Sequence, residues 1–278
     1  MNGMRPGIGI NSAGHLSIGG CDAVELAKAF GTPLYVLDEG AVRARCRAYK
    51  EGFDAFPNTE VIYAGKALLT QAVVRIIQSE GLSLDVVSGG ELYTALQAGF
   101  PAERIYFHGN NKSDDELLQG LEAGIGRFVV DNLFELERLG AFAAARNVRA
   151  AIYLRVTPGI EAHTHDYIKT GQIDSKFGFP LGDALDTAVA CALANPALDL
   201  AGFHCHIGSQ IHELTPFADA AQIMAAQIAR VKARHGHILR ELDLGGGLGI
   251  RYTGEDDPKA PGELARQVVA ALERASRE

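Results

Sequence analysis

A lysine and a run of three glycines, each directly after an apolar run, have the most recognisable chemistry in this sequence. Lys66 follows the run that ends at Ala64, where burying an ammonium group is costly unless the amine is paired or used. A buried amine without its extra proton is a nucleophile toward aldehydes. Gly245, Gly246 and Gly247 follow the other run, and successive glycines let backbone N–H groups approach an anion. We expect Lys66 to be buried and to face this glycine-lined anion site.

Each of these two motifs also has an ordinary explanation. Lys66 could carry its charge into solvent from the end of a strand, and the glycines could form a plain turn. The order Gly-Gly-Gly-Leu-Gly is not the dinucleotide-binding GxGxxG pattern, because that pattern, counted from Gly245, needs a glycine where Ile250 stands. Neither motif decides a function by itself.

Two pairs of histidines, each separated by one residue, offer a second kind of chemistry. His204 and His206 would point to the same side of a strand. They could hold zinc, lie against a cofactor ring with Ser209 on a phosphate, or be satisfied core histidines. His163 and His165 lie in a polar stretch of more than about 20 residues, and loops of that length are usually functional. A solvated insertion is the other interpretation of that stretch.

Short apolar runs alternate with longer amphipathic stretches from about residue 60 onward. We predict strands at Val61–Ala64, Ser83–Val87, Arg104–Phe107, Arg127–Val130, Ile152–Val156, Leu200–His206 and Glu241–Leu244. The stretches between them have helical spacing, and two open on the helix-starting pairs Ser113-Asp114 and Asp131-Asn132. Strands and helices that alternate in this way form a parallel sheet. The sheet is either open and doubly wound or closed into a (β/α)₈ barrel.

Polar residues stand at or just after the C-terminal end of nearly every predicted strand. They are Lys66, Ser88, His108, Asn111, Asp131, Arg155, His206, Ser209 and residues 245–247. A barrel brings all strand ends onto one face, whereas an open sheet gathers only those near one switch point. The sequence therefore favours an α/β fold of the TIM type, a (β/α)₈ barrel.

The predicted barrel is incomplete, and a separate segment precedes it. We count about seven barrel strands followed by a last helix over 262–277, so we expect residues 39–278 to form a barrel without its eighth strand. Residues 1–38 hold a predicted strand pair, His15–Gly19 and Leu34–Leu37, around a helix. They do not continue the barrel rhythm, and we assign them to a second structure. The simplest interpretation is that the sequence is a fragment.

Composition excludes several classes of partner. The net charge of −8 without a long basic run argues against nucleic acid. No apolar stretch reaches the roughly 18 residues of a transmembrane helix, and residues 1–20 do not have the pattern of a secretory signal. The four cysteines form no CxxC pair, which argues against a disulfide framework or a zinc ribbon and fits a cytoplasmic protein.

A nucleophilic lysine, phosphate-binding glycines and a ring-stacking histidine are together the parts of a pyridoxal 5'-phosphate (PLP) site, because PLP carries an aldehyde, a phosphate and a pyridine ring. The order and spacing of the motifs resemble those of the barrel-type PLP decarboxylases with the alanine-racemase-like fold. The motifs are YAGKA, DVVSGGEL, FHGNNK, RVTPG, HTH, SKFGF, HCHIGSQ and LDLGGGLGI. HTH followed by SKFG, together with HIGSQ, is most similar to the diaminopimelate decarboxylases. The resemblance runs from about residue 30 to residue 253.

The resemblance implies a role for each site residue. Lys66 would join the cofactor aldehyde, and His206 would stack on the pyridine ring; these are the implied catalytic residues. Ser209 would hold the phosphate with the glycines. The full set of implied cofactor-binding residues is Lys66, Asp85, His108, Arg155, His206, Ser209, Gly245, Gly246 and Gly247, with Asn111 facing the same pocket. The implied reaction is decarboxylation of meso-diaminopimelate to L-lysine, in a protein that forms a homodimer at full length.

The sequence departs from that family after residue 253. The family's EPGR-like stretch, whose glutamate pairs with the pyridine nitrogen, is not present, and neither are its later Cys-Glu loop and cofactor-contacting tyrosine. Residues 7–37 would be the N-terminal piece of the family's β domain. We therefore expect this chain alone to bind PLP weakly and to decarboxylate little.

Other functions stay open at this point. They are decarboxylation of arginine, ornithine or carboxynorspermidine, and PLP binding without decarboxylation. A metal-dependent barrel hydrolase using His163, His165, His204 and His206 is a further alternative, although the glycine triplet has no purpose there. We expect no metal in the favoured interpretation.

Overall fold

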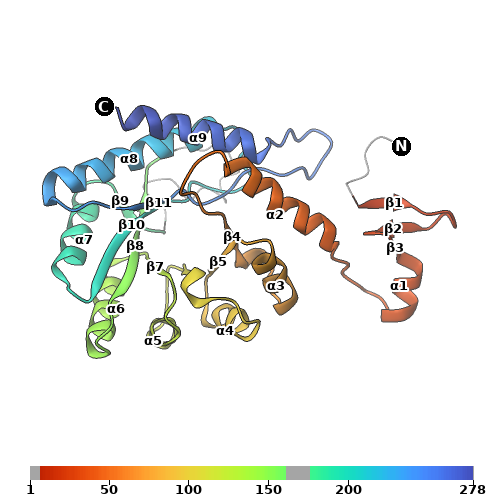
Figure 1. The fold of residues 1–278 in the computed structure, drawn as a ribbon, viewed down its shortest axis with the longest axis horizontal. Coiled ribbons are helices and arrows are strands. Elements are labelled where there is room, and N and C mark those ends of the chain that lie inside the picture. The colour runs from red at the N-terminus through yellow and green to blue at the C-terminus, as the bar shows by residue number, and fades with distance from the viewer. Residues whose placement is uncertain (1–6, 161–175, 278) are drawn as a thin grey trace.

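A curled parallel sheet with helices along its outer side forms the body of the molecule (Figure 1). The computed structural model describes residues 7–160 and 176–277. The strands follow the order β11-β10-β8-β7-β6-β5-β4, and β9 pairs with β8. Their bounds are β4 (Ile62–Ala64), β5 (Ser83–Val86), β6 (Ile105–Phe107), β7 (Arg127–Val130), β8 (Ala150–Thr157), β9 (Phe179–Pro180), β10 (Leu198–His204) and β11 (Glu241–Asp243). The predicted incomplete barrel of about seven strands is confirmed for the part of the chain that the structure describes.

The helices alternate with the strands as the sequence predicts, except that α2 comes before β4 and was not predicted. They are α2 (Glu39–Phe53), α3 (Gln71–Ser79), α4 (Gly89–Gln97), α5 (Asp114–Ala123), α6 (Leu133–Ala145), α7 (Asp183–Ala194), α8 (Thr215–His235) and α9 (Pro261–Ala275). Ser113 caps α5 in a capping box with Glu116, and Asn132 caps α6. Both caps satisfy backbone N–H groups that a helix leaves free at its start. No helix of the described residues is long and apolar enough to cross a membrane.

Alternation along each strand separates an outer core from an inner one. Side chains on the outer face of the sheet, such as Leu84, Phe107 and Leu154, pack with the helices in the large apolar core. On the inner face Tyr106, Val129, Tyr153 and Ala201 form a second, small cluster. These strands are therefore covered by apolar groups on both faces, as parallel strands usually are.

The strands β4 and β11 are the two edges of this sheet, and they do not pair with each other in the described residues. Outside them α9 packs against α8 and α2 (Figure 1). The backbones of α2 and α9 approach closely, because a Cβ at Gly52 would lie 2.9 Å from the nitrogen of Gly262. Two helices from opposite ends of the chain thus close the outer ring where the sheet stays open.

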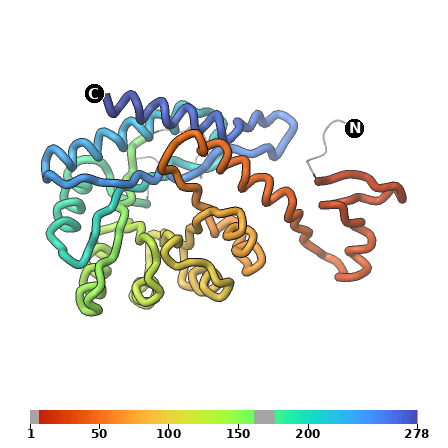
Figure 2. Tube along the Cα trace, in the orientation of Figure 1, coloured from red at the N-terminus to blue at the C-terminus, as the bar shows by residue number. Residues whose placement is uncertain are grey.

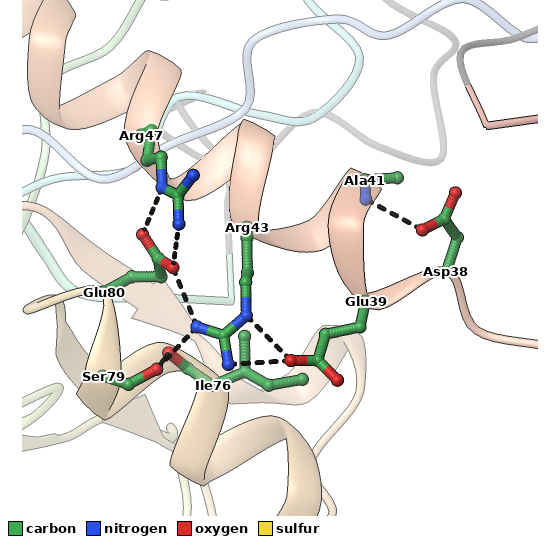
Figure 3. Close-up of polar contacts among 8 residues, drawn as sticks. All are labelled: Asp38, Glu39, Ala41, Arg43, Arg47, Ile76, Ser79 and Glu80. Atoms are coloured by element: carbon green, nitrogen blue, oxygen red, sulfur yellow. Dashed lines mark hydrogen bonds and ion pairs between the residues drawn. The ribbon is translucent and has the colours of Figure 1, made fainter. Parts of the chain in front are cut away.

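Ion pairs fasten α2 to the end of α3. Figure 3 shows the Glu80 carboxylate between two arginines of α2: Arg43 Nη1 and Arg47 Nε each donate to it at 2.8 Å. The hydrogen bonds from these arginines lower the pKa of Glu80 to about 2. Asp38 caps the start of α2 by accepting from the backbone of Ala41. This arrangement fixes α2 against the helix that follows β4.

The N-terminal segment forms a small unit of its own. Strands β1 (Ile8–Ile10), β2 (Leu16–Ile18) and β3 (Cys21–Asp22) make an antiparallel sheet beside helix α1 (Ala23–Phe30). Figure 2 shows the chain running from this unit through an extended link to α2, so that the unit lies apart from the barrel. This separation agrees with the predicted second structure. The assignment of residues 1–38 to the family's β domain stays a prediction.

One predicted strand of this segment is wrong. Residues 34–37 belong to the extended link and pair with no strand of the described chain. Their side chains are exposed, Tyr35 completely so. An apolar, β-branched run favours a strand only where a neighbour supplies its backbone hydrogen bonds, and none is within reach. The prediction also missed β1, which is the partner of β2.

Polar side chains brace the N-terminal end of the barrel interior. Arg127 of β7 forms two hydrogen bonds with Glu241 of β11, at 2.8 and 2.6 Å. The Tyr153 hydroxyl donates to the same carboxylate at 2.6 Å, and the Tyr106 hydroxyl donates to Glu60 at 2.7 Å. Because β7 and β11 are not neighbours in the sheet, these contacts cross the interior and hold the curl.

Substitution Glu241→Gln should destabilise the fold by about 1–3 kcal/mol, because it removes the charge that satisfies Arg127 across the partly buried interior. Arg240→Gln is the matched control: its pair with Asp199 is on the surface, with 51% of the arginine side chain exposed, so it should cost less than about 1 kcal/mol. Urea unfolding of both variants measures the difference. Equal losses would contradict a bracing role for the interior pair.

Candidate functional site

Six polar side chains gather inside the barrel near the C-terminal ends of its strands, and we call them the inner polar cluster. They are Asp85, His108, Asp131, Arg155, His204 and Asp243, from β5, the ends of β6 and β7, β8, β10 and β11. Tyr106, Val129 and Tyr153 are in the inner apolar cluster, and the residues two positions later point to the same side. A polar layer therefore lies directly above an apolar one, on the face where barrel enzymes place their sites.

The two histidines of this cluster meet across the barrel. The rings of His108 and His204 are 4.7 Å apart, edge to face, although their strands are separated by two others in the sheet. Burial is the main cause that lowers the pKa of both imidazoles well below the usual value. Both are therefore neutral near pH 7.

The carboxylates of the cluster hold their protons more tightly than usual. Burial, followed by repulsion from Asp243, raises the pKa of Asp85 well above its ordinary value. Burial also raises the pKa of Asp243 to about 6, although the backbone N–H of Gly245 donates to it at 2.7 Å. Asp85 Oδ2 lies 3.8 Å from His108 Nε2, and Asp85 Oδ1 has no hydrogen-bond partner among the described residues. A polar ligand could satisfy that oxygen.

Arg155 is held from two sides. Its guanidinium lies 3.5 Å from Asp131 and stacks over the ring of Phe177 at 4.3 Å. Gly178 makes this fold-back possible: its φ is +73°, and a Cβ there would lie 2.7 Å from the Arg155 carbonyl oxygen. Phe177 and Gly178 of the predicted SKFGF motif therefore pack on the predicted cofactor arginine. His163 and His165, the other residues predicted for this loop, lie outside the described residues.

Lys66 lies on a short 3₁₀ turn, η1 (Gly65–Ala67), directly after β4. The Tyr63 hydroxyl fixes this turn by donating to the Leu68 carbonyl at 2.9 Å. A Cβ at Gly65 would lie 2.6 Å from the carbonyl oxygen of Asp85. The turn is therefore held close to the end of β5, and this contact fixes where the backbone of Lys66 lies.

The expectation that Lys66 is buried is wrong, because its side chain is exposed. The physical reason is that β4 is an edge strand, so the turn after it has a neighbour on one side only. The ammonium still acts on the interior: its charge helps to lower the pKa of His108 and His206 and opposes the rise in the pKa of Asp85. Lys66 thus stands at the mouth of the barrel, within electrostatic reach of the inner polar cluster.

The loops after β10 and β11 bring the remaining predicted residues together. Ile211 N donates to the Gly247 carbonyl at 2.9 Å, and Gly249 N donates to the Ile211 carbonyl at 2.8 Å. Gly246 N donates to His206 Nδ1 at 3.4 Å. The partly buried Ser209 lies in the first of these two joined loops. The glycine triplet, His206 and Ser209 therefore form one connected surface.

The glycines of this triplet differ in whether a side chain would fit. Gly247 adopts a φ of +112°, and a Cβ there would lie 2.0 Å from the Gly208 carbonyl oxygen. Around Gly246, by contrast, a Cβ would meet nothing within 4 Å. Gly247 is thus needed for the close approach of the two loops, and Gly246 leaves open space over a backbone N–H.

The imidazole of His206 is strongly perturbed. Burial, and then the charge of Lys66, lower its pKa to about 4, so the ring is neutral and apolar on its faces at neutral pH. The predicted strand Leu200–His206 ends two residues earlier, at His204. His204 therefore belongs to the barrel interior and His206 to the loop, and they do not act as a pair.

Asp243 is the site residue that sequence reasoning missed, and Asp131 and His204 were noted without a cofactor role. Alternation could have found Asp243, because it lies two residues after the inward-facing Glu241 and pairs in register with His204. Asn111 is exposed, and its place in the same pocket as His108 stays a prediction. The roles of the other predicted site residues also stay predictions.

Comparison with known proteins decides the family. A model described as pyridoxal-dependent decarboxylase, pyridoxal binding domain, matches residues 39–278. The chain belongs to this family.

Curated relatives within the family are diaminopimelate decarboxylases. The chain is 49% identical to the enzyme of Bacillus methanolicus over 267 residues, which are 95% of this chain and 62% of that protein. It is 47% identical to the enzyme of Bacillus subtilis over 270 residues, again 62% of that protein. The chain therefore spans less than two thirds of the relatives it matches.

Solved structures agree with the family and the fold. Diaminopimelate decarboxylase from M. jannaschii, in complex with L-lysine, matches with a TM-score of 0.90 and 32% identity. The match covers 98% of this chain and 64% of that one. A lysine/ornithine decarboxylase from Vibrio vulnificus matches with a TM-score of 0.75 and 25% identity, over 90% of this chain and 62% of that one. The pyridoxal-binding barrel is thus common to decarboxylases of different specificity.

Substitution Asp243→Asn should change how stability depends on pH. The folded-state pKa is raised from 3.8 to about 6, so between these values the folded chain keeps a proton that the unfolded chain has released. The wild-type carboxyl therefore loses stability as pH rises through this window. Relative to wild type, the variant should gain on the order of 2–3 kcal/mol from about pH 4 to about pH 7.

The control for this prediction is Asp256→Asn. Backbone hydrogen bonds from Thr253 and Tyr252 lower the pKa of Asp256, so that variant should lose stability relative to wild type as pH rises. Denaturant unfolding at the two pH values measures both differences. The same sign for both variants, or a difference at Asp243 that does not change with pH, would contradict the assignment of Asp243 to the buried cluster.

Proposed function

We propose that this chain is the pyridoxal 5'-phosphate-binding part of a decarboxylase that converts meso-diaminopimelate to L-lysine. The observation that carries the proposal is that the charge of Lys66 reaches Asp85, His108 and His206. His206 in turn accepts a hydrogen bond from the backbone of Gly246. Identity of 43–49% to several diaminopimelate decarboxylases supports this substrate over others. A cytoplasmic location and a homodimer at full length belong to the same proposal.

The described residues fit this cofactor by their own chemistry. The exposed amine of Lys66 is free to reach an aldehyde at the barrel mouth. The N–H group of Gly247 and the hydroxyl of Ser209 can donate to a phosphate. The N–H group of Gly246 can turn to the same anion, because its bond to His206 Nδ1 is long, at 3.4 Å. The open space over Gly246 has room for such an anion. The neutral ring of His206 lies next to this space and offers a face for a pyridine ring.

The inner polar cluster would serve the acid–base part of the reaction. Asp85 has a raised pKa and an Oδ1 without a partner among the described residues. It can therefore hold a proton at that oxygen, within electrostatic reach of the Lys66 amine. Arg155, fixed by Asp131 and Phe177, keeps a positive charge in the barrel that opposes the cluster's carboxylates. When bound, the pyridoxal group would supply the electron sink for the charge left as carbon dioxide departs.

Cofactor binding tests the site directly. Lys66→Ala should abolish the visible absorbance of a bound pyridoxal group and the borohydride-stable mass increase on the peptide that contains residue 66. Lys232→Ala, which removes an exposed lysine of α8, should leave both unchanged. Unaltered labelling of the Lys66→Ala variant would show that another lysine holds the cofactor.

The phosphate site can be tested separately from the lysine. Gly246→Ala should weaken cofactor affinity by about 10-fold or more, because its Cβ fills the space over the backbone N–H groups, while thermal stability stays near wild type because the Cβ meets no protein atom within 4 Å. Gly247→Ala should lower stability itself, because its Cβ would meet Gly208. Equal cofactor affinity in wild type and Gly246→Ala would place the phosphate elsewhere.

Substrate choice is tested by carbon dioxide release from meso-diaminopimelate, L-ornithine, L-arginine and L-lysine. We expect release from meso-diaminopimelate alone, and at a low rate with this chain, since the family's EPGR-like motif is not in its sequence. Faster release from ornithine or arginine would overturn the substrate assignment. It would leave the cofactor site intact, because the preceding tests do not depend on turnover.

A further inference from the structure

Three members of the inner polar cluster could ligate a metal ion. One ring nitrogen each of His108 and His204 and a carboxylate oxygen of Asp243 all lie within 4.8 Å of one another. They come from the end of β6, from β10 and from β11, so the barrel itself brings them together. We propose that the chain binds one divalent cation of the zinc class between His108, His204 and Asp243.

Burial and an unused nitrogen support a ligand at this place. His204 is 3% exposed and His108 is 8% exposed. The Nδ1 atom of His204 has no hydrogen-bond partner among residues 7–160 and 176–277. An unsatisfied buried nitrogen costs free energy, and a bound cation would use its lone pair.

The donor set favours zinc or cobalt over magnesium or calcium. Two imidazoles and one carboxylate are ligands that zinc accepts in four-coordinate sites with an open position. Ligand atoms about 2.0–2.1 Å from a tetrahedral ion are about 3.4 Å apart, so side-chain movements of about an ångström would complete the site. Asp85 Oδ2 lies 3.8 Å from His108 Nε2. A shift that brings this pair to hydrogen-bond distance would let the carboxylate orient the ligating imidazole.

Nearby charges set the balance for a cation. Three carboxylates, those of Asp85, Asp131 and Asp243, face the interior at this level. Arg155 opposes them, but Asp131 lies 3.5 Å from its guanidinium. Lys66 adds a positive charge at the mouth, where it is exposed and free to move away. Asp85 has a raised pKa and Asp131 is offset by Arg155, so Asp243 is the carboxylate of this group that would balance a cation. Binding would release any proton that Asp243 holds.

Metal binding by the purified, chelator-treated chain tests the proposal. Equilibrium dialysis against buffered Zn²⁺ should give one ion per chain, and Co²⁺ should give the intense visible bands of a four-coordinate site. Asp243→Asn, which keeps an acceptor for the Gly245 N–H, and His204→Ala should each weaken binding about 100-fold or more. His235→Ala, which removes an exposed histidine at the end of α8, should bind as the wild type does.

Circular dichroism of each variant shows whether the fold is retained, and Asp243→Asn covers the case in which His204→Ala does not fold. No ion bound by wild type, or full binding by a folded Asp243→Asn chain, would overturn the proposal. These outcomes are separate from those of the cofactor tests, because they use the chain without pyridoxal phosphate and leave Lys66 unchanged.

Discussion

Contacts between side chains of strands that are not neighbours hold this barrel in its curled form. Arg127 and Glu241 meet near the bottom of the interior, and His108 and His204 meet two residues higher. Such contacts exist only if the sheet bends far enough to bring β11 over β7 and β10 over β6. The same bend puts the strand ends, and with them the polar side chains, on one face. The chemistry of the site therefore depends on a brace that is remote from it.

Periodic features of the sequence were sufficient for most of the fold. Apolar runs and helix caps such as Ser113 and Asn132 located the strands and helices to within about two residues, and polar residues at strand ends indicated a barrel. The apolar run at residues 34–37 was wrongly predicted as a strand. A strand needs a partner strand, and whether one is available depends on the tertiary structure. The predicted burial of Lys66 was wrong for a similar reason: it required a second neighbour beside β4, and a local motif does not show whether such a neighbour exists.

The site was predictable to the extent that its residues lie in distinctive motifs. Lys66, His206 and the glycines stand in such motifs. In the structure Gly246 donates to His206, and the charge of Lys66 reaches the same imidazole. Asp243 and His204 lie inside ordinary strand sequence, and their importance comes from meeting His108 across the barrel. Register between β10 and β11 decides that meeting. It cannot be recognised from spacing along the chain alone.

Lys66 connects the mouth of the barrel with its interior, because the charge of this exposed amine affects the pKa values of buried groups. Burial keeps the imidazoles of the inner polar cluster neutral and raises the pKa of its carboxylates. The charge of Lys66 at the mouth helps to lower the pKa of His204 and opposes the rise in the pKa of Asp85. A cofactor that bonds to this amine would bring its ring and phosphate between the cluster and the joined loops. The family to which the chain belongs takes its name from such a cofactor.

A crystal structure of the chain grown with pyridoxal 5'-phosphate and reduced with borohydride would test this arrangement most directly. We expect continuous density from Lys66 Nζ to the pyridoxal ring, with the ring on His206 and the phosphate at the N–H groups of Gly246 and Gly247. Density that joins the cofactor to another lysine, or that places the phosphate away from these glycines, would contradict it.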